Sequence, residues 1–162
     1  MAAWQFALQL VPTAWVAQEG NGVDALCDED GFDTYHAWLE HQPRSGFATL
    51  FESLLPEAPS WSAAVRVWGD EKRTDVYLSY ENGFVESIRI RIDVRENTPA
   101  VRDKVVAIAK ALNCVFFFPG ERAIVAPNER TLGEAIGRSR AAQFVNDPHC
   151  YLAHPADRSE AL

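Results

Sequence analysis

The residues suited to metal binding are few, and their spacing does not complete a site. His149, Cys150 and His154 lie close together, and Cys150 and His154 would share one face of a helix. Zinc requires four protein ligands, or three with a water, and no second Cys/His cluster lies at zinc spacing. His36 and His41 are five residues apart, which is wrong for a pair on one helical face. We therefore expect no metal site.

The acidic stretch 28–33 is similar in composition to a calcium-binding loop. Aligning Gly31 with the glycine of such a loop places Leu26 at the first ligand position and Ala37 where the bidentate glutamate belongs. Neither residue can bind calcium. The same acids could supply the paired carboxylates of glycoside hydrolysis, but nothing in the sequence indicates a cleft between them. A solvated acidic surface is the simpler interpretation.

Motifs of nucleophilic catalysis and phosphate binding are absent from the sequence. It contains no Gly-x-Ser-x-Gly and no glycine-rich loop that opens a helix. A Cys/His pair needs only to be close in space, so we consider the cysteines themselves. Cys114 begins an apolar stretch and is expected to be buried and inert. Cys27 precedes Asp28 and Glu29, whose negative charges disfavour a thiolate. We expect no catalytic residue and no cofactor, although an enzyme site assembled from distant residues stays open.

Acidic and aromatic residues are concentrated together near the N-terminus. The first 42 residues contain seven of the 23 acidic residues and none of the 15 lysines and arginines, and the net charge of the chain is −8. Aromatic residues lie between these acids, and aromatic anchors beside charges are typical of protein–protein interfaces. Trp38 could equally belong to the core. The predicted partner-binding residues are Asp24, Asp28, Glu29, Asp30, Asp33, Tyr35 and Trp38.

The charge distribution indicates which partners the chain would attract. An acidic surface repels nucleic acid and anionic membranes and attracts a basic protein. No apolar run reaches the roughly 18 residues of a membrane-spanning helix, and the N-terminal residues lack the basic region and apolar core of a signal peptide. The three cysteines are scattered and odd in number, which argues against a disulfide framework. We expect a cytoplasmic protein that binds neither nucleic acid nor membrane.

Alternation of apolar and polar residues predicts strands over 4–10, 65–68, 76–80 and 88–94. The last two strands are joined at Glu81-Asn82-Gly83, and we expect a three-residue loop with Gly83 left-handed. This loop would pair Val76 with Ile88 and place Asp75 opposite Arg89. A two-residue Asn82-Gly83 loop would instead place Arg89 on the apolar face.

The remaining elements complete a prediction of the fold. Helices are expected over 33–39, capped by Asp33, over 47–55, capped by Ser45, over 99–113 and over 129–145, with strands at 114–118 and 123–126. We expect a single α+β domain over residues 1–162 whose tail frays from about residue 153. Its sheet would be mainly antiparallel, with about five to six strands and three to four helices packed mostly on one side.

Chain length, expected cytoplasmic location and the acidic stretch from Glu19 to Glu40 with its aromatics together resemble the small acidic immunity proteins of bacterial toxin–immunity systems. The resemblance is to this class of proteins and includes no signature motif. It implies a non-enzymatic protein that inhibits a basic toxin domain through charge and shape complementarity. A secretion chaperone, an adaptor or a structural subunit is the alternative, and a small enzyme is a further one.

Overall fold

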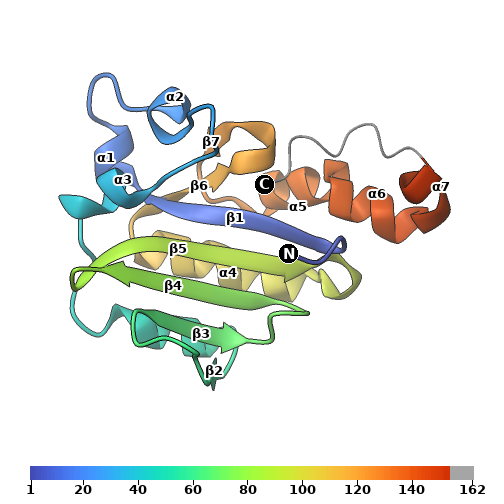
Figure 1. The fold of residues 1–162 in the computed structure, drawn as a ribbon, viewed down its shortest axis with the longest axis horizontal. Helices are drawn as coiled ribbons and strands as arrows, with labels where there is room; N and C mark the ends of the chain where they lie inside the picture. Colours follow the sequence, from blue (N-terminus) through green and yellow to red (C-terminus); the bar gives the residue numbers. More distant parts are fainter. Residues whose placement is uncertain (154–162) are drawn as a thin grey trace.

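A seven-stranded antiparallel sheet organises the chain. The computed structural model describes residues 1–153, and for Cys150, Leu152 and Ala153 it describes the backbone alone. His154 and the tail that was expected to fray lie outside the described residues. The strands are β1 (Gln5–Pro12), β2 (Glu57–Ala58), β3 (Val65–Gly69), β4 (Asp75–Glu81), β5 (Phe84–Asp93), β6 (Cys114–Phe118) and β7 (Ala123–Val125). Their order in the sheet is β2-β3-β4-β5-β1-β6-β7 (Figure 1).

Ten helical segments surround the sheet, seven of them α-helices, within the described residues. They are α1 (Thr13–Val16), α2 (Val23–Leu26), α3 (Tyr35–Leu39), η1 (Phe47–Ser53), η2 (Val94–Glu96), α4 (Pro99–Ala111), η3 (Pro119–Glu121), α5 (Glu129–Arg138), α6 (Arg140–Asn146) and α7 (Pro148–Ala153). The predicted α+β class and antiparallel sheet are confirmed, and the two-residue strand β2 was missed. In the described part of the chain, no helix has the length and apolarity needed to cross a membrane.

The main core lies between one face of the sheet and the segments η1, α4 and α5. Along β1, Phe6, Leu8 and Leu10 alternate with Gln5, Ala7 and Gln9, and all three are buried in this core. The helical segments contribute from the other side, with Phe51 of η1, Val105 of α4 and Ile136 of α5. Figure 1 shows α4 behind the central strands. The alternation predicted from the sequence therefore assigns this face correctly.

The opposite face is divided into two parts. Over β1 and β6 it is covered by the segment that contains α1, α2 and α3, and a second cluster lies between them: Val11, Trp15, Leu26, Ala37 and Phe117. In front of β3, β4 and β5, none of the described helices covers the sheet (Figure 1). We call this uncovered part the open face. The prediction that helices pack mostly on one side is confirmed for η1, α4 and α5, which lie against one face. The helices α1, α2 and α3 belong to the segment on the opposite face.

The β4–β5 hairpin corrects the predicted register. Glu81 pairs with Phe84 across a two-residue turn, in which Asn82 and Gly83 have φ of 52° and 83°. A bulge between Ser79 and Tyr80 then shifts the pairing by one residue. The expected three-residue loop is wrong because this bulge restores the alternation.

The bulge decides which residues lie opposite one another. Val76 pairs with Ile90, Leu78 pairs with Ile88, and Tyr77 pairs with Arg89. The apolar pairs point into the core, while Tyr77 and Arg89 point to the open face. The register that was expected, with Val76 opposite Ile88, is therefore off by two residues, and all the residues concerned keep the faces predicted for them.

Two predicted helices differ from the structure. The helix expected over 129–145 breaks at Ser139, which has ψ of 158°, and its hydroxyl accepts the amide hydrogen of Ala142 to start α6. The segment expected as a helix over 47–55 is the 3-10 helix η1, preceded by Gly46 with φ of 79° and no cap from Ser45. Local side-chain bonds and a left-handed glycine override the helical periodicity in these places.

The start of α3 also differs in detail from the prediction. Its N-cap position is occupied by Thr34, and no side chain caps the helix there. Asp33 accepts the Tyr35 amide hydrogen at 2.7 Å instead. The prediction of Asp33 as N-cap is therefore wrong by one residue, although its carboxylate does bind a backbone amide at this helix end.

The segment 34–42 closes a gap between β1 and β5. These strands pair only as far as Gln9 and Arg89, and beyond that point β1 continues along β6. Side chains replace the missing ladder: the Trp38 indole donates to the Leu10 carbonyl at 3.2 Å. Gln42 accepts the amide hydrogen of Val85 at 2.7 Å and donates to its carbonyl at 3.1 Å. The segment therefore satisfies backbone groups that the separated strands leave unpaired.

Replacement of Trp38 by Phe tests this anchoring. The smaller ring leaves the Leu10 carbonyl without its buried donor and opens a cavity, so we expect a loss of at least about 2 kcal/mol in unfolding free energy. The measurement is urea denaturation of the wild type and the variant. Trp61→Phe is the matched control, because Trp61 is 81% exposed, and it should cost less than about 1 kcal/mol. Equal losses in the two variants would contradict the anchoring.

Candidate interaction surface

The acidic residues 28–30 lie in a tight turn with its own hydrogen bonds. Cys27 and Phe32 form an antiparallel bridge, and the Asp28 amide donates to the Gly31 carbonyl at 3.0 Å. The Asp28 side chain accepts the amide hydrogen of Asp30 at 2.9 Å. We call residues 27–33 the acidic turn. Its backbone is held by these contacts, so the carboxylates project from a defined scaffold.

The acidic turn is fastened to the sheet by its aromatic residue. The rings of Phe32 and Phe117 are 5.7 Å apart and meet edge to face. Leu26, which precedes the turn, is buried in the cluster with Phe117, and its carbonyl accepts the Asp33 amide hydrogen at 2.8 Å. Both ends of the turn are thus tied to buried structure.

The carboxylates of the acidic turn have no cationic partners among the described residues. Asp24, on α2, lies 3.8 Å from Arg122 and is fully exposed. Asp28, Glu29 and Asp30 are exposed, and none of the ion pairs between described residues includes them. Their charge therefore reaches solvent without local compensation.

Most of the predicted partner-binding residues are accessible, and one is not. Asp24, Asp28, Glu29, Asp30 and Asp33 are exposed, and Tyr35 is half-buried. These residues lie in or beside the acidic turn, as the sequence suggested. Trp38 is 1% exposed and belongs to the main core, because its indole fills the gap between β1 and β5. Of the two interpretations of Trp38, the structure supports the core residue, and a contact role is wrong.

The open face carries residues that were not predicted as a site. One row of paired positions crosses five strands. It begins in the covered part with the buried residues Phe117 of β6 and Gln9 of β1, and it continues on the open face with Arg89, Tyr77 and Val67. Phe32 of the acidic turn rests on the first of them, so the acidic turn and this row are neighbours on the same side of the sheet.

Aromatic side chains lie on the open face. The Trp61 indole donates to the Tyr77 hydroxyl at 2.9 Å while the Trp61 ring stays exposed. The guanidinium carbon of Arg89 lies 4.8 Å from the centre of the Tyr77 ring. Phe84 is 46% exposed, and it points to this face because its neighbour Val85 points into the core. Tryptophan, tyrosine and arginine are the residues most enriched at the energetic centres of protein interfaces.

The two arginines of the open face differ in their partners. Arg91 donates through Nε to Asp75 at 2.8 Å and also through Nη2, and both residues are buried. This hydrogen bond to Asp75 raises the pKa of Arg91. Burial lowers the pKa of Arg89, and the charge of Arg91 lowers it further. Arg89 therefore carries a partly desolvated charge without a bound carboxylate.

Two buried polar atoms at adjacent positions on this face have no hydrogen-bond partner. They are Nε of Arg89 and Oε1 of Gln9, and these residues pair across β5 and β1. Gln9 is 4% exposed. Leaving a buried donor or acceptor unpaired costs about 1–3 kcal/mol, so such atoms in a folded protein call for an explanation.

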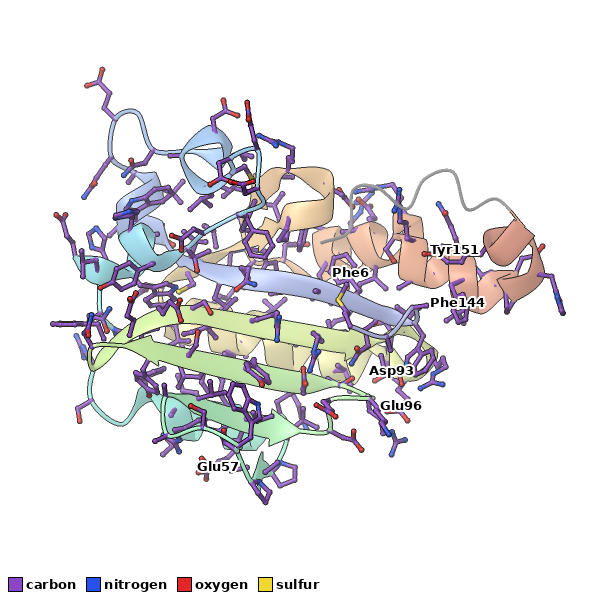
Figure 2. The ribbon with its side chains drawn as sticks, in the orientation of Figure 1. Phe6, Glu57, Asp93, Glu96, Phe144 and Tyr151 are labelled. Atoms are coloured by element: carbon purple, nitrogen blue, oxygen red, sulfur yellow. The ribbon has the colours of Figure 1, made fainter. Side chains whose placement is uncertain are left out.

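A shallow hollow at the β2 edge offers little for catalysis. It has a volume of about 480 Å³ and is lined by residues that include Glu57, Arg73 and Glu96, of which Figure 2 labels Glu57 and Glu96. Glu57 binds Arg66 at 2.8 Å, and Arg73 pairs with Glu96. The hydrogen bond from Arg66 lowers the pKa of Glu57, which disfavours a role as proton donor.

The residues that were considered for metal binding and nucleophilic catalysis do not come together. In the part of the chain that the structure describes, no three His, Cys, Asp or Glu side chains form a cluster suited to a metal ion. Cys114 is buried, and burial raises the pKa of its thiol to about 12. A thiol that stays protonated is a poor nucleophile, so Cys114 does not support the Cys/His pair considered from the sequence.

Comparison with models of protein families, with curated proteins and with solved structures found no match to this chain.

Alkylation of the cysteines tests the buried state of Cys114. With a thiol pKa of about 12, only about one Cys114 in ten thousand is ionised at pH 8. In a Cys150→Ser background, which leaves Cys27 and Cys114 as the two thiols, iodoacetamide should modify Cys27 in the folded protein. Cys114 should react only after unfolding in urea, as read by mass spectrometry. Rapid alkylation of Cys114 in the folded state would reopen a nucleophilic role.

Proposed function

We propose that the protein is a non-enzymatic binding protein that holds a basic protein partner through the acidic turn and the adjoining open face. The observation that carries this proposal is that the two surfaces lie on the same side of the sheet: the Phe32 ring rests on Phe117, and the row of paired residues continues from Phe117 to Arg89 and Tyr77 of the open face. One partner can therefore contact both the uncompensated carboxylates and the aromatic residues of the sheet.

The acidic turn would govern the approach of the partner. Its carboxylates are exposed and have no described cation within reach, so their field extends into solvent and attracts a basic surface. Such steering accelerates association and weakens as salt increases. The turn is already held by backbone hydrogen bonds, which reduces the entropy lost on binding.

The open face would supply the contacts that hold the complex. Trp61, Tyr77 and Phe84 offer aromatic area on one side of the sheet, and a sheet without helical cover presents a broad, flat surface. A flat surface with aromatic anchors fits a protein partner better than a small molecule, which is usually enclosed in a concave site.

Within this class, the function that we propose is that of a cytoplasmic immunity protein, which blocks a basic toxin domain by covering its active site. Carboxylates of the acidic turn would occupy cationic residues of the toxin that otherwise bind an anionic substrate. The free thiols of Cys27 and Cys114 are compatible with a reducing compartment. A secretion chaperone, an adaptor or a structural subunit is the second candidate, and it would bind through a mainly apolar surface that is insensitive to salt.

Charge reversal in the acidic turn tests the proposal. Affinity capture from the source cells, with elution by increasing salt, should recover a stoichiometric basic protein. The double variant Asp28→Lys/Asp30→Lys should then associate with that protein about tenfold or more slowly at low salt, because steering is lost. Stopped-flow or surface-plasmon kinetics measure the rate.

The control variant reverses two exposed acids elsewhere. Glu52 on η1 and Asp103 on α4 are exposed and belong to segments on the other side of the sheet. The double variant Glu52→Lys/Asp103→Lys changes the net charge by the same amount as Asp28→Lys/Asp30→Lys. It should slow association much less. Recovery of no basic partner, or equal slowing by the two double variants, would contradict the proposal; a salt-insensitive apolar complex would favour the chaperone or adaptor.

A further inference from the structure

Trp61 is the most exposed large apolar side chain among the described residues, yet its position is fixed. Its side chain belongs to a residue that is 81% exposed, which is unusual for a tryptophan. The indole N–H donates to the Tyr77 hydroxyl at 2.9 Å, so the one polar atom of the side chain already has a partner. The part of Trp61 that is left for a contact is therefore its aromatic ring.

Hydrogen bonds on both sides of Trp61 hold the loop between β2 and β3 that carries it. The Ser60 hydroxyl donates to the Ser62 carbonyl at 3.0 Å and accepts the amide hydrogen of Ser62 at 3.3 Å. The Ser62 hydroxyl accepts the amide hydrogen of Ala64, and the Ser62 carbonyl accepts that of Val65, both at 3.2 Å. The ring is thus presented from a closed turn, which reduces the entropy lost when a partner binds it.

Arginines lie over two of the other tryptophan rings in this protein. The guanidinium carbon of Arg95 is 4.3 Å from the centre of the Trp4 ring, and that of Arg66 is 4.8 Å from the centre of the Trp68 ring. Among the described residues, neither an arginine nor another aromatic ring lies against Trp61. The most exposed tryptophan therefore lacks a cationic contact that this chain makes elsewhere.

The ring of Tyr77, to which Trp61 is hydrogen-bonded, already has cations of this chain beside it. The guanidinium carbons of Arg89 and Arg91 lie 4.8 and 5.7 Å from its centre, and Asp75 holds Arg91 in place. Of the two hydrogen-bonded rings, Trp61 is the one that remains free. Tryptophan is also the aromatic side chain that attracts a cation most strongly.

We propose that Trp61 receives an arginine side chain of the basic protein partner, with the guanidinium stacked on the indole ring. The face of an aromatic ring carries negative charge density and attracts a cation, as the acidic turn does, so one basic surface complements both. Arginine suits this position better than lysine because its planar guanidinium stacks on a ring. This inference rests on the proposed function and adds which residue type the partner brings to the open face.

A titration of the free protein tests the Trp61 site without the partner. The probe is N-acetyl-arginine N-methylamide, added to uniformly ¹⁵N-labelled protein at constant ionic strength, and N-acetyl-citrulline N-methylamide is its uncharged counterpart. The indole N–H signal of Trp61, assigned by its absence in Trp61→Phe, should shift about threefold further with the arginine probe at equal concentration. The signal of buried Trp38 should shift with neither probe. Equal shifts of Trp61 with the two probes would overturn the proposal.

Kinetics with a captured partner test the same contact in the complex. Replacing Trp61 alone by fluorinated tryptophans withdraws electron density from the ring and nearly keeps its shape. The lifetime of the complex should fall as fluorine atoms are added, by about fivefold or more for the tetrafluorinated ring. Trp61→Leu should shorten the lifetime about tenfold or more, while its backbone amide spectrum shows that the fold is retained. A lifetime that does not depend on fluorination would overturn the arginine contact.

These experiments separate the arginine contact from the acidic turn. If fluorination leaves the lifetime unchanged and Asp28→Lys/Asp30→Lys still slows association, the arginine contact is wrong and the proposed function stands. If the lifetime falls with fluorination and the charge reversal has no effect on association, the contact at Trp61 stands and steering by the acidic turn is wrong. Capture of no basic partner would contradict the proposed function, and the probe titration would still decide whether Trp61 binds a guanidinium.

Discussion

The separation of β1 from β5 is the constraint on which the rest of this structure depends. Where the strands part, the carbonyls of Leu10, Val85 and Glu86 and the amide of Val85 lose their ladder partners, and Trp38, Gln42 and Thr34 replace them. Each of these groups would cost about 1–3 kcal/mol if it were buried unpaired. The segment 34–42 is therefore fixed against the sheet. The residues before it are packed over β1 and β6, and the front of β3, β4 and β5 stays uncovered (Figure 1).

This arrangement links the acidic turn and the open face to one scaffold. Buried Trp15, Leu26 and Ala37 hold the segment that carries the acids, so a strongly charged surface is kept in place by an apolar underside. The same packing ends at Phe32, next to the row that contains Gln9 and Arg89. Negative charge and an unpaired arginine thus lie on one side of the molecule.

Much of the sheet was predictable from the sequence because alternation of apolar residues reports directly on burial. The acids of the turn were also found from composition, since charge clusters need no knowledge of register. The open face was not found. Alternation assigns its residues to the correct side of their strands, but which strands the helices leave uncovered depends on packing between distant segments, which alternation does not report. Trp38 shows the opposite limit: it lies within the acidic N-terminal part of the sequence, and only the gap between β1 and β5 makes it a core residue.

Amide hydrogen exchange in the protein without a partner tests the central claim, that the acidic turn is held in place before binding. The amides of Asp28 and Asp33 donate to the carbonyls of Gly31 and Leu26, and the amide of Val85 donates to Gln42. The account predicts slowed exchange at all three, with Val85 the most protected because it lies in the buried sheet. Exchange of Asp28 and Asp33 at the rate of an unfolded peptide, beside a protected Val85, would show that the turn forms only on binding and would contradict the account.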